Sequence, residues 1–116
     1  MTLLKNIHGV GIDMVEVSRF ENILKNKQTA FLEKVFLPSE RKYCQSHKDR
    51  AVHFAGLFAA KEAVSKALGV KQYPFSEIEI CHDKDGKPVA YHRCKKLQVM
   101  VSITHIKKIA SAIAIG

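Results

Sequence analysis

The stretch at residues 51–69 restricts the fold more than any other part of the chain, because it predicts one long helix that is covered on almost every side. It is rich in alanine, leucine, phenylalanine and valine, contains no proline and ends on glycine. At about 100° per residue its large apolar side chains fall in one wide stripe, and most of the remaining circumference is alanine. We expect this helix at the centre of the molecule, with other backbones packed close to it.

Three residues of the charged types, Lys61, Glu62 and Lys66, lie on this predicted helix. Lys61 falls inside the apolar stripe, and Glu62 and Lys66 are one turn apart on its flank. In the simpler interpretation, Glu62 and Lys66 form an (i, i+4) ion pair and the stem of Lys61 lies along apolar surface. In the alternative, a carboxylate and two ammonium groups line a site for a metal and a phosphorylated ligand. The helix alone does not decide between them.

The first strand is predicted at residues 7–15. Its alternation suggests that Val10, Ile12 and Met14 face the core and that Asp13 points to the other face. Gly9 and Gly11 leave that other face thin, so another backbone can approach it closely.

The remaining pattern predicts an α+β fold, with helices packed on one face of an antiparallel sheet. Helical segments are expected at 16–25, 31–36 and 39–47, and the strands after Gly69 at 78–81, 88–91, 97–102 and 110–115, with a hairpin turn at 83–86. Ser102, Thr104 and His105 come at the end of one of these strands. They are compatible with phosphate binding or with capping the next turn, and no Ser–His–Asp triad follows from them without geometry.

Composition narrows the class of protein. The 116 residues suit a single domain over 1–116, and a formal net charge of +8 favours an acidic partner. No run of about 18 apolar residues and no signal-peptide pattern occurs. The three cysteines lack zinc-ligand spacing and are expected to be free thiols. We expect a soluble cytoplasmic protein that does not bind membranes.

Five segments match a known family in order and spacing: GIDMVEVSRF at 11–20, FAAKEAVSKALG at 58–69, DGKP at 85–88, VSITH at 101–105 and ASAIAI at 110–115. Together they closely resemble the holo-acyl-carrier-protein synthases, the small bacterial phosphopantetheinyl transferases. The resemblance implies transfer of 4′-phosphopantetheine from coenzyme A to a serine of apo acyl carrier protein, in support of fatty acid biosynthesis. It also implies Mg²⁺ as cofactor, with Mn²⁺ as the alternative, and a homotrimer with its active site at the subunit interface.

The same resemblance implies roles for residues of the long helix and the first strand. Asp13 and Glu62 match the metal carboxylates, and Lys61 and Lys66 match two lysines that face the phosphates of coenzyme A. Asp13, Glu62 and Lys66 are therefore the expected catalytic residues. Lys66 is expected to stabilise charge on the pyrophosphate, and Glu62 is the first candidate for the base that takes the serine proton.

Further roles fall outside that helix. His105, together with Ser102 and Thr104, is expected to contact a phosphate of coenzyme A, and Arg19 matches an arginine that contacts the acidic carrier protein. The chain also departs from the family pattern. Thr104 replaces a frequent serine, Ile106 a polar or acidic residue, Leu57 a frequent arginine, and Val70-Lys71 a Thr-Gly loop.

Two other interpretations stay open at this point. The basic charge alone would suit a nucleic-acid-binding module, but the chain has no aromatic-rich strand motif, no helix-turn-helix signature and no dense cluster of Arg and Lys. A trimer that has lost catalysis is the other alternative, although Asp13, Lys61, Glu62 and Lys66 are all present. We therefore expect no nucleic acid among the partners.

Overall fold

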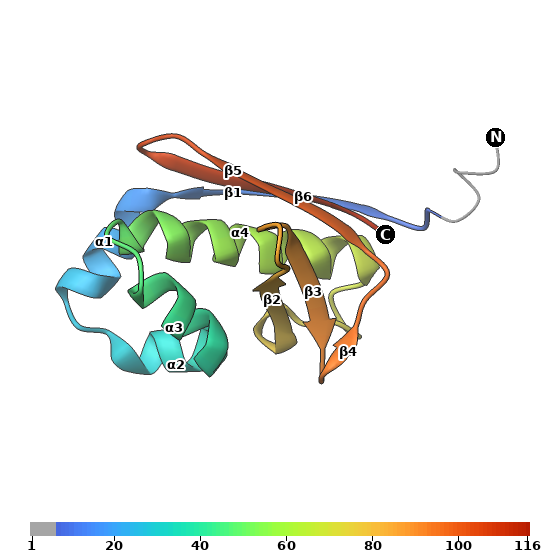
Figure 1. Cartoon of the computed structure of the whole chain (residues 1–116), viewed down its shortest axis with the longest axis horizontal. Coiled ribbons are helices and arrows are strands. Elements are labelled where there is room, and N and C mark those ends of the chain that lie inside the picture. Colours follow the sequence, from blue (N-terminus) through green and yellow to red (C-terminus); the bar gives the residue numbers. More distant parts are fainter. Residues whose placement is uncertain (1–6) are drawn as a thin grey trace.

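The computed structural model describes residues 7–116, and its longest element is the helix α4, Arg50–Leu68 (Figure 1). Three shorter helices precede it: α1 Val17–Lys25, α2 Thr29–Val35 and α3 Pro38–Gln45. The strands are β1 Val10–Glu16, β2 Ile78–His82, β3 Pro88–His92, β4 Lys95–Lys96, β5 Met100–His105 and β6 Ile109–Ile115, with a short 3₁₀ turn at Phe75–Glu77 before β2. None of the helices described is both long and apolar enough to span a membrane.

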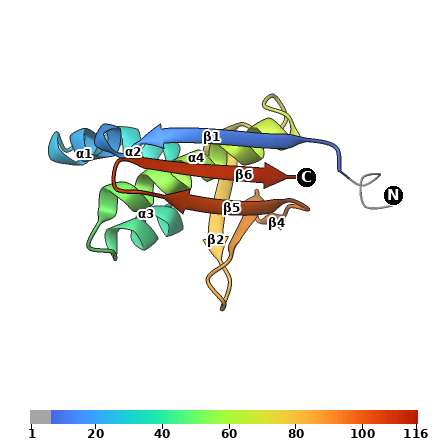
Figure 2. The same ribbon diagram turned by 90° about the horizontal axis from the view of Figure 1, so that it is seen from above.

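The strands form two antiparallel sheets. The order β1-β6-β5 makes one sheet, and α4 runs along one face of it; β2-β3-β4 makes the other, beside the second half of α4 (Figures 1 and 2). The expected α+β class is confirmed, although the strands divide between two sheets. The strand expected at 97–102 begins later, at Met100, and continues to His105.

β1 and α4 are in direct backbone contact because two glycines face the helix. A Cβ atom built on Gly11 would lie 1.8 Å from the carbonyl oxygen of Ala63, and one on Gly9 would lie 2.0 Å from that of Ala67. No side chain fits in either place. The close approach expected from these glycines is therefore confirmed, and it brings the backbone of Asp13 next to α4.

The predicted inward face of β1 was wrong. Val10, Ile12 and Met14 are 60%, 62% and 67% exposed in the single chain, whereas Gly11 and Val15 are buried. The reason is steric, since only the glycine-bearing face of the strand can approach the backbone of α4. An apolar strip is left on the outer face of the sheet.

Four phenylalanines, Phe20, Phe36, Phe54 and Phe58, connect the short helices to α4. Their ring centroids lie 5.0 to 6.4 Å apart, a range typical of packed aromatic side chains. The cluster fixes α1 against α4, and α1 carries Arg19. The apolar stripe expected on α4 is confirmed for Phe54, Phe58 and Val64, which are buried.

Candidate functional site

Asp13, Glu62 and Lys66 meet where β1 crosses α4, and we call these three residues the β1–α4 site. Nζ of Lys66 lies 3.2 Å from Oδ1 of Asp13 and donates to the carbonyl oxygen of Ile12 at 3.1 Å. Partial burial raises the pKa of Glu62, and the negative charge of Asp13 raises it further, while the charges of Lys66 and Arg19 act in the opposite direction. Lys66 thus pairs with Asp13 across the two elements. The Glu62–Lys66 ion pair of the simpler interpretation is not formed within residues 7–116.

Two carboxylates placed close together attract a cation. The β1–α4 site offers only these two, and in the described part of the chain no group of three or more His, Cys, Asp or Glu side chains is placed to hold a metal. A hard divalent ion here would need further oxygen ligands from a substrate or from water. The site therefore suits a metal that enters together with a phosphorylated ligand.

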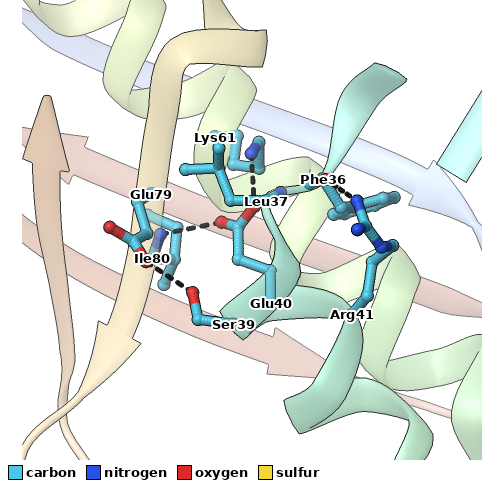
Figure 3. A network of polar contacts seen from close by, with 8 residues as sticks. All are labelled: Phe36, Leu37, Ser39, Glu40, Arg41, Lys61, Glu79 and Ile80. Atoms are coloured by element: carbon cyan, nitrogen blue, oxygen red, sulfur yellow. Dashed lines mark hydrogen bonds and ion pairs between the residues drawn. The ribbon is translucent and has the colours of Figure 1, made fainter. Parts of the chain in front are cut away.

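Lys61 lies in the core, away from the β1–α4 site. Its Nζ is 2.5 Å from Oε1 of Glu40, and both side chains are fully buried. The carboxylate of Glu40 also accepts the backbone N–H groups of Leu37 and Ile80, at 2.9 and 2.8 Å, so that one ion pair ties α3 and β2 to α4 (Figure 3). Burial lowers the pKa of Lys61 and raises that of Glu40, and the opposite charge of the partner acts against both shifts.

The position of Lys61 differs from the one expected from the sequence, where it faces a phosphate beside Lys66. The two lysines point from α4 to different places, and only Lys66 joins the two carboxylates. The partner of Lys61 lies 21 residues earlier on another helix. The sequence therefore held no local signal for this pair.

A cavity of about 710 Å³ opens between α4, β5 and the hairpin that joins β2 to β3. Ser102 and His105, two of the expected phosphate contacts, line it, and Thr104 is not among its lining residues. The size is within the usual range for a small-molecule site. Leu57, which replaces a frequent arginine of the family, also lines this cavity and is 2% exposed.

A row of rings that the sequence did not predict lies beside the cavity, and three of its four members, Tyr43, His53 and His82, line it. The rings of Tyr43 and His82 lie 4.2 Å apart at 14°, and those of His47 and His53 lie 3.8 Å apart at 20°. Tyr43 also packs against His47, with centroids 4.6 Å apart. These side chains come from α3, α4, β2 and the segment between α3 and α4, so their spacing in the sequence carries no signal.

Arg19 is exposed on α1, with its guanidinium carbon 4.9 Å from the ring centroid of Phe58. Its charge also acts on Glu62, which places it beside the β1–α4 site. An arginine so placed can meet an acidic partner whose reacting group enters that site.

Comparison with known proteins shows the family of this chain. The model of the 4′-phosphopantetheinyl transferase superfamily matches residues 9–115. The chain belongs to this superfamily. A holo-[acyl-carrier-protein] synthase of Bacillus velezensis is 45% identical over 114 residues, which cover 91% of this chain and 92% of that protein.

Two members of the superfamily with solved structures have the same fold. One is a holo-(acyl-carrier-protein) synthase from Bacillus anthracis in complex with CoA (3′,5′-ADP), 36% identical, with a TM-score of 0.78 and coverage of 94% of this chain and 95% of that one. The other, from Helicobacter pylori in complex with coenzyme A, is 32% identical, with a TM-score of 0.79 and coverage of 92% and 99%. The family expected from the sequence motifs is thereby confirmed.

Proposed function

We propose that this protein is a holo-acyl-carrier-protein synthase, which transfers 4′-phosphopantetheine from coenzyme A to a serine of apo acyl carrier protein. The serine oxygen bonds to the phosphorus that bears pantetheine, and the bond from that phosphorus to the bridging pyrophosphate oxygen breaks. Adenosine 3′,5′-bisphosphate leaves. The observation that carries the proposal is the meeting of Asp13, Glu62 and Lys66 at the crossing of β1 and α4.

Asp13 and Glu62 are the residues that would hold Mg²⁺, or Mn²⁺ in its place. The negative charge of Asp13 raises the pKa of Glu62 in the protein alone, as expected of two carboxylates placed to share one cation. When bound, such a cation would offset the charge that develops on the pyrophosphate. Because two carboxylates are few ligands for Mg²⁺, the phosphate oxygens of coenzyme A would complete its coordination.

The chain's own side chains account for the remaining chemistry. Lys66, 46% exposed, can move its ammonium from Asp13 to a pyrophosphate oxygen. Glu62, on α4 beside Asp13 and Lys66, is the candidate base for the serine proton. Transfer of a phosphoryl group depends mainly on positioning and on stabilisation of charge, which these groups provide.

The cavity between α4, β5 and the β2–β3 hairpin would hold the nucleotide end of coenzyme A. Ser102 and His105 would then contact its 3′-phosphate. β5 and β1 are the two edge strands of their sheet, with β6 between them. The two ligand-binding regions thus lie toward opposite edges of one chain, and a second copy can bring the β5 cavity of one subunit next to the β1–α4 site of another.

A homotrimer would supply such a neighbour. The outer face of the sheet exposes Val10, Ile12, Met14, Met100 and Ile113, an apolar strip that association would bury. We expect light scattering to give the mass of a trimer. A monomer with full activity at working concentration would contradict this assembly.

The acidic carrier protein would dock against α1. The formal net charge of +8 favours its encounter with this chain, and Arg19 lies beside the β1–α4 site, where the acceptor serine must enter. The cytoplasmic location expected for this protein would give it access to coenzyme A and to the carrier protein. That location stays a prediction.

The proposed function is tested by incubating the protein with coenzyme A, Mg²⁺ and apo acyl carrier protein and measuring the intact mass of the carrier. We expect the mass to increase by one phosphopantetheine group. A carrier whose acceptor serine is replaced by alanine serves as the control and should not change. A wild-type carrier of unchanged mass across conditions would overturn the proposal.

A further inference from the structure

The lysines and the carboxylates that line the cavity are equal in number, so their formal charges sum to zero. Its lysines are Lys87 and Lys96, and its carboxylates are Asp83 and Asp85. The other ionisable side chains that line it are one phenol and three imidazoles, those of Tyr43, His53, His82 and His105. Because burial raises the pKa of Tyr43, its phenol stays neutral. The charge that a phosphate meets in this cavity is therefore set by the protonation of histidines.

His53 lies at the start of α4, next to Asp49. Its Nδ1 lies 3.0 Å from the carbonyl oxygen of Asp49 and 3.3 Å from Oδ1 of the same residue. The side chain is 21% exposed and reaches the cavity wall. Leu57, which follows one turn later on α4 and lines the same wall, contributes no charge.

The neighbouring rings limit how many protons the row can hold. His47 is stacked on His53 at 3.8 Å, so two charges there would repel each other. Burial lowers the pKa of His82, and charge on His47 and His53 lowers it further, against a smaller opposing effect of Asp83.

We propose that His53 and His82 bind the 3′-phosphate of coenzyme A as protonated imidazoles, so that the affinity for coenzyme A rises as the pH falls through the neutral range. This rests on the proposed function, which gives the cavity its ligand. A phosphate monoester carries close to two negative charges near pH 7. Imidazolium groups give charge-assisted hydrogen bonds to such an anion, and imidazoles titrate in the same pH range.

The proposal is tested by calorimetric titration of coenzyme A at about pH 8 and about pH 6.5, where imidazole changes its charge. Wild-type affinity should increase about tenfold at the lower pH, since a nearby opposite charge shifts a pKa by a unit or more. His53→Gln and His82→Gln should each remove most of that increase. His92→Gln is the matched control, because His92 is bound to Glu77, 3.0 Å away, and does not line the cavity.

Two further measurements exclude a folding defect and the titration of the ligand. His53→Arg carries a permanent charge, so at about pH 8 it should bind coenzyme A more tightly than wild type does at the same pH, a gain that a misfolded variant cannot give. Dephospho-coenzyme A lacks the 3′-phosphate, and its affinity for the wild type should not depend on pH. The phosphate's own titration near pH 6 is common to all variants and cancels in the comparison.

An affinity of wild type for coenzyme A that does not change with pH would overturn this inference, and so would a pH dependence that His53→Gln and His92→Gln alter equally. Failure of the proposed function gives a different result. In that case, the carrier protein keeps its mass at saturating coenzyme A at every pH.

Discussion

The ammonium of Lys66 lies 3.2 Å from Oδ1 of Asp13 and so joins the last turns of α4 to the middle of β1. The pair is formed across two elements that touch through the glycine face of β1. Lys66 is paired with Asp13, and the pKa of the neighbouring Glu62 is raised by burial and by the charge of Asp13. In the protein alone, the carboxylate of Asp13 is thus neutralised by Lys66, and that of Glu62 is available to a cation.

Lys66→Met should lower the transfer rate about 10²- to 10³-fold, because one well-placed cation on a developing charge contributes about that much. The free energy of unfolding should change by less than about 1 kcal/mol, since the pair is partly exposed. Steady-state kinetics and urea denaturation measure the two effects. Lys71→Met, on an exposed lysine beyond the helix, is the control. A rate for Lys66→Met within about threefold of wild type would show that Lys66 does not stabilise the pyrophosphate.

The central helix and the fold class could be predicted because their signals are local. A proline-free apolar stretch that ends on Gly69 defines α4, and an almost continuous run of apolar residues defines β6. Which face of β1 turns inward could not be predicted from alternation. The face that carries Gly9 and Gly11 packs on α4, because a side chain at either position would collide with the backbone of the helix. The apolar side chains of Ile12 and Met14 are therefore exposed in the single chain.

The candidate site was predictable only in part. Asp13, Glu62 and Lys66 belong to motifs, and the structure brings them together. The pairing of Lys61 with Glu40, and the row of rings that includes His53, depend on how α3 packs against α4. Such long-range contacts leave no periodic pattern in a single sequence.

Lys61→Met should destabilise the protein by about 3–5 kcal/mol, because it leaves the buried carboxylate of Glu40 without its partner. Glu40→Gln combined with Lys61→Met leaves no buried charge, and its amide oxygen can still accept a backbone N–H group. The double variant should therefore be more stable than Lys61→Met alone. Urea denaturation measures both, and a loss below about 1 kcal/mol for Lys61→Met would mean that Lys61 is not needed in the core and can reach a phosphate instead.

Glu62→Gln should raise the melting temperature of the metal-free protein at neutral pH. The pKa of Glu62 is raised above its ordinary value of 4.5 in the folded state, so its ionisation disfavours folding as the pH rises through the shifted pKa. Below pH 4.5 the side chain is protonated in both states, and wild type and variant should then melt alike. Thermal melts between acidic and neutral pH check this. A variant that melts lower than wild type at neutral pH would contradict the environment described for Glu62.

Arg19→Ala should raise the KM for carrier protein about five- to tenfold, equivalent to roughly 1 kcal/mol, and leave the KM for coenzyme A nearly unchanged. Arg19 is exposed on α1 beside the β1–α4 site and faces an acidic partner in the proposed reaction. Lys25→Ala, at the far end of the same helix, is the matched control. Equal losses for both substrates would indicate that Arg19 acts on Glu62 and not in docking.

The central claim is that Asp13 and Glu62 share one divalent cation with the phosphates of coenzyme A. Calorimetric titration of coenzyme A with and without Mg²⁺ tests it most directly, on wild type, on Glu62→Gln and on Glu33→Gln, an exposed control on α2. In wild type and control, Mg²⁺ should increase the affinity for coenzyme A about tenfold or more. By linkage, coenzyme A should increase the affinity for Mg²⁺ by the same factor. Glu62→Gln should lose that coupling and keep its fold. If Glu62→Gln and wild type show the same Mg²⁺ dependence, Glu62 is not a ligand and the claim is contradicted.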